Sequence, residues 1–76
     1  MKLFAGGHLA FFLPGRKSPV EVSVHSPTPL TSVLEELGIP IGEVNLAAVN
    51  GREVDLHETV IWDQDEINII SAVDGG

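Results

Sequence analysis

The sequence has 76 residues, of which 43% are hydrophobic, and it contains no cysteine, so disulfides, thiolate metal sites and a cysteine nucleophile are excluded. No apolar run approaches the roughly 20 residues of a membrane span. Residues 1–4 are followed at once by Gly6 and Gly7, which is not the pattern of a secretory signal. We therefore expect a single soluble, cytoplasmic domain that is stabilised by an apolar core and makes no membrane contact.

The formal net charge is -7, and the acidic residues are concentrated in the second half of the chain. From residue 43 onward the single base Arg52 accompanies eight acids: Glu43, Glu53, Asp55, Glu58, Asp63, Asp65, Glu66 and Asp74. Such a surface repels phosphate backbones, so we expect no direct contact with nucleic acid. Two interpretations remain open: the charge only maintains solubility, or it marks a docking face for a basic protein partner.

The first half of the chain is only partly defined by its pattern. Residues 2–5 are compatible with a first strand that ends at two glycines. The apolar run at residues 9–13 is too short for its periodicity to separate strand, helical turn and loop. Residues 20–25 alternate between apolar and polar side chains, which predicts a half-buried strand, and residues 26–29 interrupt it.

A helix is the clearest element of the sequence. Thr28 is expected to be its N-cap, with Pro29 at the first helical position, where a missing N–H costs nothing. The apolar residues that follow have i, i+3, i+4 and i+7 spacing and share one face: Leu30, Val33, Leu34 and Leu37. Gly38 is predicted to end the helix in a left-handed conformation, and Pro40 prevents its continuation.

A hairpin is predicted next. Residues 44–49 resemble a strand, and Asn50-Gly51 favours a type I′ turn because both positions accept a positive φ. Residues 52–54 would return from that turn. Residues 56–62 show no clear pattern, although Trp62 is expected to be partly buried.

A polar turn at residues 63–66 precedes a last strand at residues 67–71. In that strand Ile67 and Ile69 point one way, and we assign them to the core beneath the helix. Ile70 points the other way. The predicted order is strand, strand, helix, strand, short strand, strand, which indicates an α+β domain with one helix covering one face of a mixed sheet.

The sequence ends in Asp74-Gly75-Gly76. Glycine has no Cβ, so such a segment can enter a channel that is too narrow for other residues. Taken alone, the two glycines are also compatible with a frayed end of no importance. The sequence that precedes them has to decide between these interpretations.

The element order and this ending resemble the MoaD/ThiS sulfur carriers, β-grasp relatives of ubiquitin, over nearly the whole chain. Four motifs at matching spacing carry the resemblance: Leu37-Gly38-Ile39-Pro40, Val49-Asn50-Gly51, the acidic turn Asp63-Gln64-Asp65-Glu66-Ile67, and Ser71-Ala72-Val73-Asp74-Gly75-Gly76. The resemblance implies a ubiquitin-like β-grasp domain at residues 1–73, with one main helix on a mixed sheet of roughly four to five strands. A flexible diglycine tail is expected at residues 74–76. The chain departs from the family pattern at Gln64, at Ser71-Ala72 and at Asp74.

The resemblance also implies a carrier rather than an enzyme. A ubiquitin-activating-type partner would use ATP to adenylate the Gly76 carboxylate, and persulfide sulfur would displace AMP to leave a thiocarboxylate. Gly75 would allow the tail to thread into the partner. The chain itself would bind neither a cofactor nor a metal, and it would act as a cosubstrate or as the small subunit of a synthase complex.

A sulfur-accepting synthase is the second partner that the resemblance implies. Its acceptor would be a molybdenum or tungsten pterin precursor, the thiamine thiazole, a transfer RNA uridine or an amino-acid precursor. Docking requires some exposed apolar area near the tail. We expect the partner contacts to include Ile70, Val73, Ala48 and Asp74. The alternative for Ile70 is a core residue at the end of a strand.

Two other functions remain open at this point. A ubiquitin-like modifier would use the same adenylation but join Gly76 to a lysine amine. A β-grasp interaction module would leave the diglycine without a role, because one fold serves many functions. His8, His25 and His57 are too widely spaced to form a recognisable zinc site.

Overall fold

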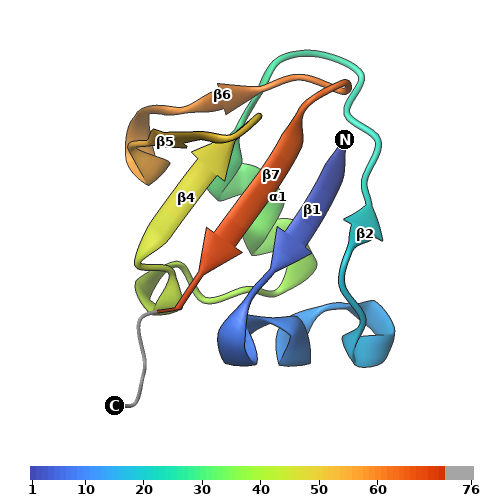
Figure 1. Ribbon diagram of the computed structural model, residues 1–76. Coiled ribbons are helices and arrows are strands. Elements are labelled where there is room, and N and C mark those ends of the chain that lie inside the picture. The colour runs from blue at the N-terminus through green and yellow to red at the C-terminus, as the bar shows by residue number, and fades with distance from the viewer. Residues whose placement is uncertain (72–76) are drawn as a thin grey trace.

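The computed structural model describes residues 1–71, and its centre is a five-stranded mixed sheet (Figure 1). The strands of this sheet are β1 (Lys2–Ala5), β2 (Val20–Glu21), β4 (Leu46–Val49), β5 (Arg52–Val54) and β7 (Glu66–Ile70). They are ordered β2-β1-β7-β4-β5, with β1 and β7 parallel and the other neighbours antiparallel. A separate two-stranded sheet pairs β3 (Thr28–Pro29) with β6 (Val60–Ile61).

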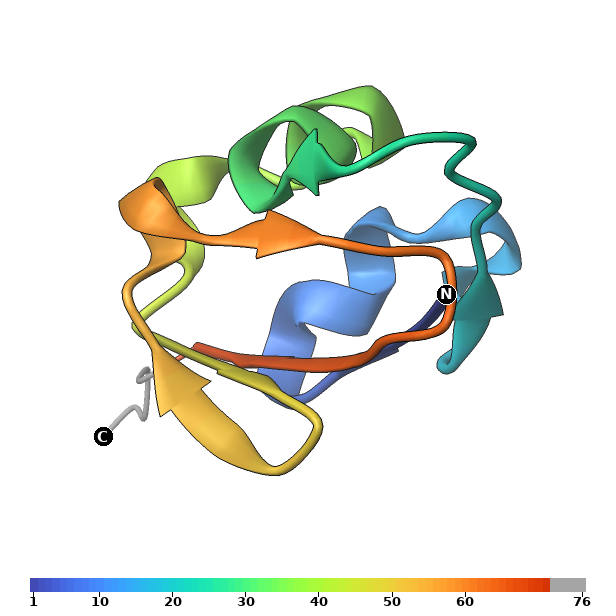
Figure 2. The ribbon, with the colours of Figure 1, turned by 90° about the horizontal axis from the view of Figure 1, so that it is seen from above.

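One α-helix, α1 (Leu30–Leu37), lies over one face of the main sheet (Figure 2). The connections contain four 3-10 helices: η1 (Gly7–Phe12), η2 (Pro14–Arg16), η3 (Ile41–Glu43) and η4 (Leu56–Glu58). Most of residues 9–13, which the sequence left unassigned, therefore lie in η1. Within residues 1–71 no helix is both long and apolar enough to cross a membrane.

The core fills the space between α1 and the sheet. Leu30, Val33 and Leu34 of the helix are buried, and Leu37 is half-buried against them, as their spacing predicted. From the sheet side, Ile67 and Ile69 of β7 are fully buried, which confirms their assignment to the core. Burying side chains of this size contributes about 1.5–3 kcal/mol each.

The start of the helix differs from the prediction. Pro29 is the N-cap, and Thr28 lies in β3 with its hydroxyl donating to the Ser26 carbonyl at 2.8 Å. A residue before proline is disfavoured in the helical region, which keeps Thr28 extended and available for strand pairing. The first helical N–H, that of Leu30, instead donates to the carbonyl of Thr59 at 2.9 Å.

The end of the helix and the hairpin follow the prediction. Gly38 has a φ of 84°, and its N–H donates to the Glu35 carbonyl at 3.0 Å. In the β4–β5 turn, Asn50 and Gly51 have φ values of 53° and 86°. Positive φ at both central residues is the type I′ geometry that suits the twist of a hairpin.

Two other expectations are corrected. The predicted strand at residues 20–25 shrinks to β2, although the alternation of half-buried and exposed side chains continues to His25. Further along, the Val24 N–H donates to the side chain of Asp63 rather than to a strand. Trp62 is 58% exposed rather than partly buried, because Ile61 occupies the inward position of β6 and its neighbour therefore points outward. The boundary predicted at residue 73 lies outside the described residues.

Candidate functional site

An apolar patch lies on the face of the main sheet that α1 does not cover, at the end where β7 finishes. Side chains alternate along a strand, so the burial of Ile67 and Ile69 directs their neighbours to this opposite face. Ile70 is 45% exposed there. We call this surface the open-face patch, and it consists of Phe4, Leu46, Ala48, Asn68 and Ile70.

Strand pairing explains why these residues share one surface. Leu46 of β4 is directly opposite Ile70 of β7, and Ala48 is opposite Asn68. On the other side of β7, Phe4 of β1 is aligned with Asn68. The structure therefore brings Ile70 and Ala48, two of the predicted contact residues, onto the same face of neighbouring strands.

Leu46 and Phe4 were not among the residues expected at this site. Leu46 is 37% exposed and Phe4 is half-buried. The period of two along residues 44–49 places Leu46 on the same side as Ala48, and this signal was present in the sequence. For Phe4, the position of β1 beside β7 had to be known first, because it is the neighbouring strand that brings Phe4 to the patch.

The end of β7 is held on both sides. The Asn45 N–H donates to the Ile70 carbonyl at 2.9 Å, and the Gly6 N–H donates to the Ile69 carbonyl at 2.9 Å. Gly6 also approaches Ile70 closely, since a Cβ at this position would be 3.6 Å from its Cγ1. The chain is thus fixed beside the open-face patch up to Ile70. The other predicted site residues, Val73, Asp74, Gly75 and Gly76, lie outside the described residues.

Two 3-10 helices meet near this end of the sheet. His8 of η1 and Glu43 of η3 join them, with 3.0 Å between Nε2 and Oε1. The side chains of both residues are partly exposed, at 44% and 46%. The Arg16 guanidinium of η2 lies 4.3 Å from the centroid of the Phe11 ring of η1. Within the part of the chain that the structure describes, no group of three or more His, Asp or Glu side chains is arranged to hold a metal ion.

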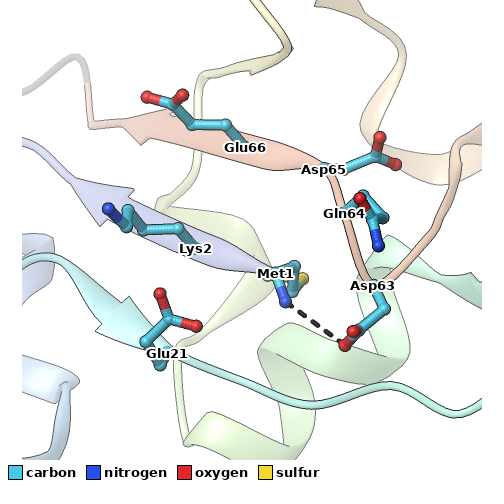
Figure 3. Close-up of a pocket in the computed structure, with 7 residues that line it drawn as sticks. All are labelled: Met1, Lys2, Glu21, Asp63, Gln64, Asp65 and Glu66. Carbon is cyan, nitrogen blue, oxygen red and sulfur yellow. Dashed lines mark hydrogen bonds and ion pairs between the residues drawn. The ribbon is translucent and has the colours of Figure 1, made fainter.

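A polar pocket of about 260 Å³ lies at the opposite end of the sheet, where β1 and β7 begin (Figure 3). Its lining consists of Met1, Lys2, Glu21, Asp63, Gln64, Asp65 and Glu66. Two of these carboxylates organise the fold: Asp63 accepts from the Met1 ammonium at 3.5 Å, and Asp65 accepts from the side chain of Asn50 at 2.9 Å. Asp65 also accepts from the Trp62 N–H at 2.8 Å. These bonds give the pocket a structural role.

Asp63 makes the stability of the fold sensitive to pH. The Val24 N–H, which donates to it at 3.0 Å, and the nearby Met1 ammonium hold the pKa of this carboxyl below its usual value of 3.8. A group with a lowered folded pKa stabilises the fold above its unfolded pKa, and that contribution is lost as the pH falls through the folded pKa. We therefore expect Asp63→Asn to lower the free energy of unfolding at neutral pH.

The difference between wild type and Asp63→Asn should shrink as the pH falls below 3.8, because the unfolded wild-type chain then binds a proton at this carboxyl before the folded chain does. Denaturant unfolding between neutral pH and about pH 3 measures this difference. Glu53→Gln is a suitable control, since Glu53 is exposed on β5 and loses the same charge. A difference that stays constant over the whole pH range would contradict the assignment to Asp63.

A single helix lying across a mixed sheet, with β1 and β7 parallel at its centre and the β4–β5 hairpin beside them, is the ubiquitin-like β-grasp fold of the α+β class. Residues 2–72 match the Mut7-C ubiquitin family, and the chain belongs to that family. The sulfur carrier protein TtuB of Thermus thermophilus is a relative, 39% identical over 64 residues that cover 84% of this chain and 91% of that protein. The resemblance to the MoaD/ThiS carriers is confirmed by these two matches.

Proposed function

We propose that this protein is a sulfur carrier, a cosubstrate whose Gly76 carboxylate is adenylated by a ubiquitin-activating-type enzyme and converted to a thiocarboxylate. The similarity to TtuB over most of the length of both chains supports this role. The last motif of the MoaD/ThiS resemblance, which contains Gly75-Gly76, supports it too, and the chain contains no cysteine of its own. The sulfur chemistry would take place on the partners and on the terminal carbon, and ATP would be bound by the activating enzyme.

The observation that carries the proposal is the position of the open-face patch at the end of β7. Ile70 and Leu46 expose apolar area next to the point where the chain leaves the sheet. Exposed apolar area surrounded by polar residues is typical of a protein contact surface. Here the rim includes Lys2, Glu53 and Glu66. A partner that covers the patch would therefore receive the residues that follow Ile70, up to Gly76, directly into its active site.

The proposal includes two partners and leaves the acceptor open. The activating enzyme would bind first. A sulfur-accepting synthase would then bind the thiocarboxylate form of the protein and receive its sulfur. The acceptor classes are a pterin precursor, the thiamine thiazole, a transfer RNA uridine and an amino-acid precursor. We place the reaction in the cytoplasm, where ATP and the activating enzyme would be available.

The test is the intact mass of the protein after purification from its native cells. A sulfur carrier will show a fraction in which one oxygen has been replaced by sulfur, and fragmentation will locate the exchange at Gly76. A ladder of conjugates joined through lysine would instead identify a ubiquitin-like modifier. A terminal carboxylate that stays unmodified in the presence of an activating enzyme and ATP would rule out both functions.

A further inference from the structure

Strand β6 exposes a second apolar surface, distinct from the open-face patch. Val60 is 50% exposed and Trp62 is 58% exposed, whereas Ile61 between them is fully buried. Pro29 of β3 is exposed as well and pairs with Val60. Paired residues of antiparallel strands point to the same face, so these three side chains form one apolar ridge, which we call the β6 ridge.

The backbone of β6 has a free edge beside this ridge. Proline has no N–H, so the pairing of Pro29 with Val60 is of the type in which the two residues do not bond each other. The bond next to this pair, from the Leu30 N–H to the Thr59 carbonyl at 2.9 Å, agrees with that register. The N–H and C=O of Val60 therefore point away from β3. No strand in residues 1–71 covers that edge, because β6 belongs to a sheet of two strands.

The surroundings of the free edge are acidic. Glu58 precedes β6 and is exposed, whereas Asp63, which follows β6, already has its carboxylate 3.5 Å from the Met1 ammonium. No lysine or arginine occurs in residues 53–71. Charge would therefore select the segment that pairs with β6: cationic side chains would be attracted to Glu58, and acidic side chains would be repelled.

We propose that the free edge of β6 binds an extended, lysine- or arginine-rich segment of a protein partner as an added strand. Its backbone would bond the N–H and C=O of Val60, its apolar side chains would pack on the β6 ridge, and its cations would lie near Glu58. Strand addition of this kind combines backbone hydrogen bonds with side-chain selection. It also protects an edge that otherwise favours aggregation.

The β6 ridge lies at the end of the molecule opposite to the point where β7 finishes (Figure 1). A segment bound to β6 thus leaves the open-face patch accessible, so this surface serves a contact that is compatible with an enzyme acting on the tail. The proposal does not depend on the chemistry at Gly76. It holds equally if the diglycine proves inert.

The test uses the full chain and a short blocked peptide of alternating lysine and valine. Trp62 is the single tryptophan of the chain, so its fluorescence reports binding at this edge. We expect a saturable shift of its emission to shorter wavelength, weakened by salt, together with a shift of the Val60 amide signal in NMR spectra. The matched peptide of alternating glutamate and valine should give neither change.

Variants separate the backbone bonds from the charge selection. Val60→Pro removes the outward N–H and should weaken the lysine peptide about tenfold. Glu58→Lys should weaken it as well, whereas Glu36→Lys, with the same change in net charge on the exposed face of α1, should not. If Val60→Pro does not fold, Glu58→Lys still decides the question of charge.

Five outcomes would overturn the proposal. The lysine peptide fails to bind, the glutamate peptide binds equally well, the NMR shifts map to the open-face patch, or Glu36→Lys and Glu58→Lys have equal effects. Self-association of the chain that covers Trp62 would also overturn it, since the occupant of the edge would then be a second copy. Sedimentation over a range of concentrations measures that association.

Discussion

Adding one alanine after Gly76 is expected to abolish activation by the adenylating enzyme while the fold remains intact. The extension moves the carboxylate away from the position of attack and introduces a Cβ into a passage that suits glycine. Misplacement of a reacting group by an ångström can cost about a hundredfold in rate, and a whole residue should cost more. Pyrophosphate release in the presence of ATP and the activating enzyme measures the effect, because adenylation of the carboxylate frees pyrophosphate, and thermal unfolding verifies the fold.

A variant extended by glycine instead of alanine is the matched control. It shifts the carboxylate by the same length without adding a side chain, so comparison of the two separates length from steric exclusion. We expect both to be inactive, as well as a variant that lacks Gly76. Sulfur transfer by the alanine-extended protein, with no protease restoring the diglycine, would show that Gly76 is not the reactive end.

Ile70→Glu is expected to weaken association with the activating enzyme about thirtyfold, corresponding to about 2 kcal/mol for a central contact residue. The cause is the desolvation of a carboxylate in an apolar contact. The free energy of unfolding should change by less than about 0.5 kcal/mol, because Ile70 is 45% exposed and contributes little to the core. Binding measured by calorimetry and unfolding measured in denaturant give the two quantities.

Ser32→Glu provides the control for charge. Ser32 is exposed on α1, on the other side of the sheet from the open-face patch, and the substitution changes the net charge by the same amount. It should leave association unchanged. Equal weakening by Ser32→Glu and Ile70→Glu would mean that long-range repulsion causes the loss, and no weakening by Ile70→Glu would exclude the patch as the docking surface.

The parts of the fold that depend on local chemistry could be predicted from the sequence. The apolar face of α1, the left-handed Gly38 and the Asn50-Gly51 turn each follow from a few neighbouring residues. The start of α1 could not, because Thr28 pairs with Ile61, far away in the sequence. The prediction for Trp62 was wrong for another reason. A strand of two residues is too short to reveal from its sequence which of its sides faces the core.

The candidate site shows the same division. Alternation along β7 was enough to place Ile70 opposite the core. Leu46 shares the side of Ala48 by the same alternation, whereas Phe4 required the strand order and register, which arise from packing of the whole domain. The sequence therefore indicated residues on β7 and β4, and the fold showed that these two strands are neighbours and that β1 adds Phe4.

The double attachment of the end of β7 sets a limit on the geometry of any partner. Gly6 and Asn45 fix the chain at Ile69 and Ile70, so the span available to the carboxylate is counted from this point. The six residues 71–76 can extend at most about 22 Å beyond Ile70. An enzyme that acts on Gly76 must therefore place its reacting groups within that distance of the surface that contacts the sheet. The length of the segment after Ile70 limits how far apart the enzyme's docking surface and its active site can be.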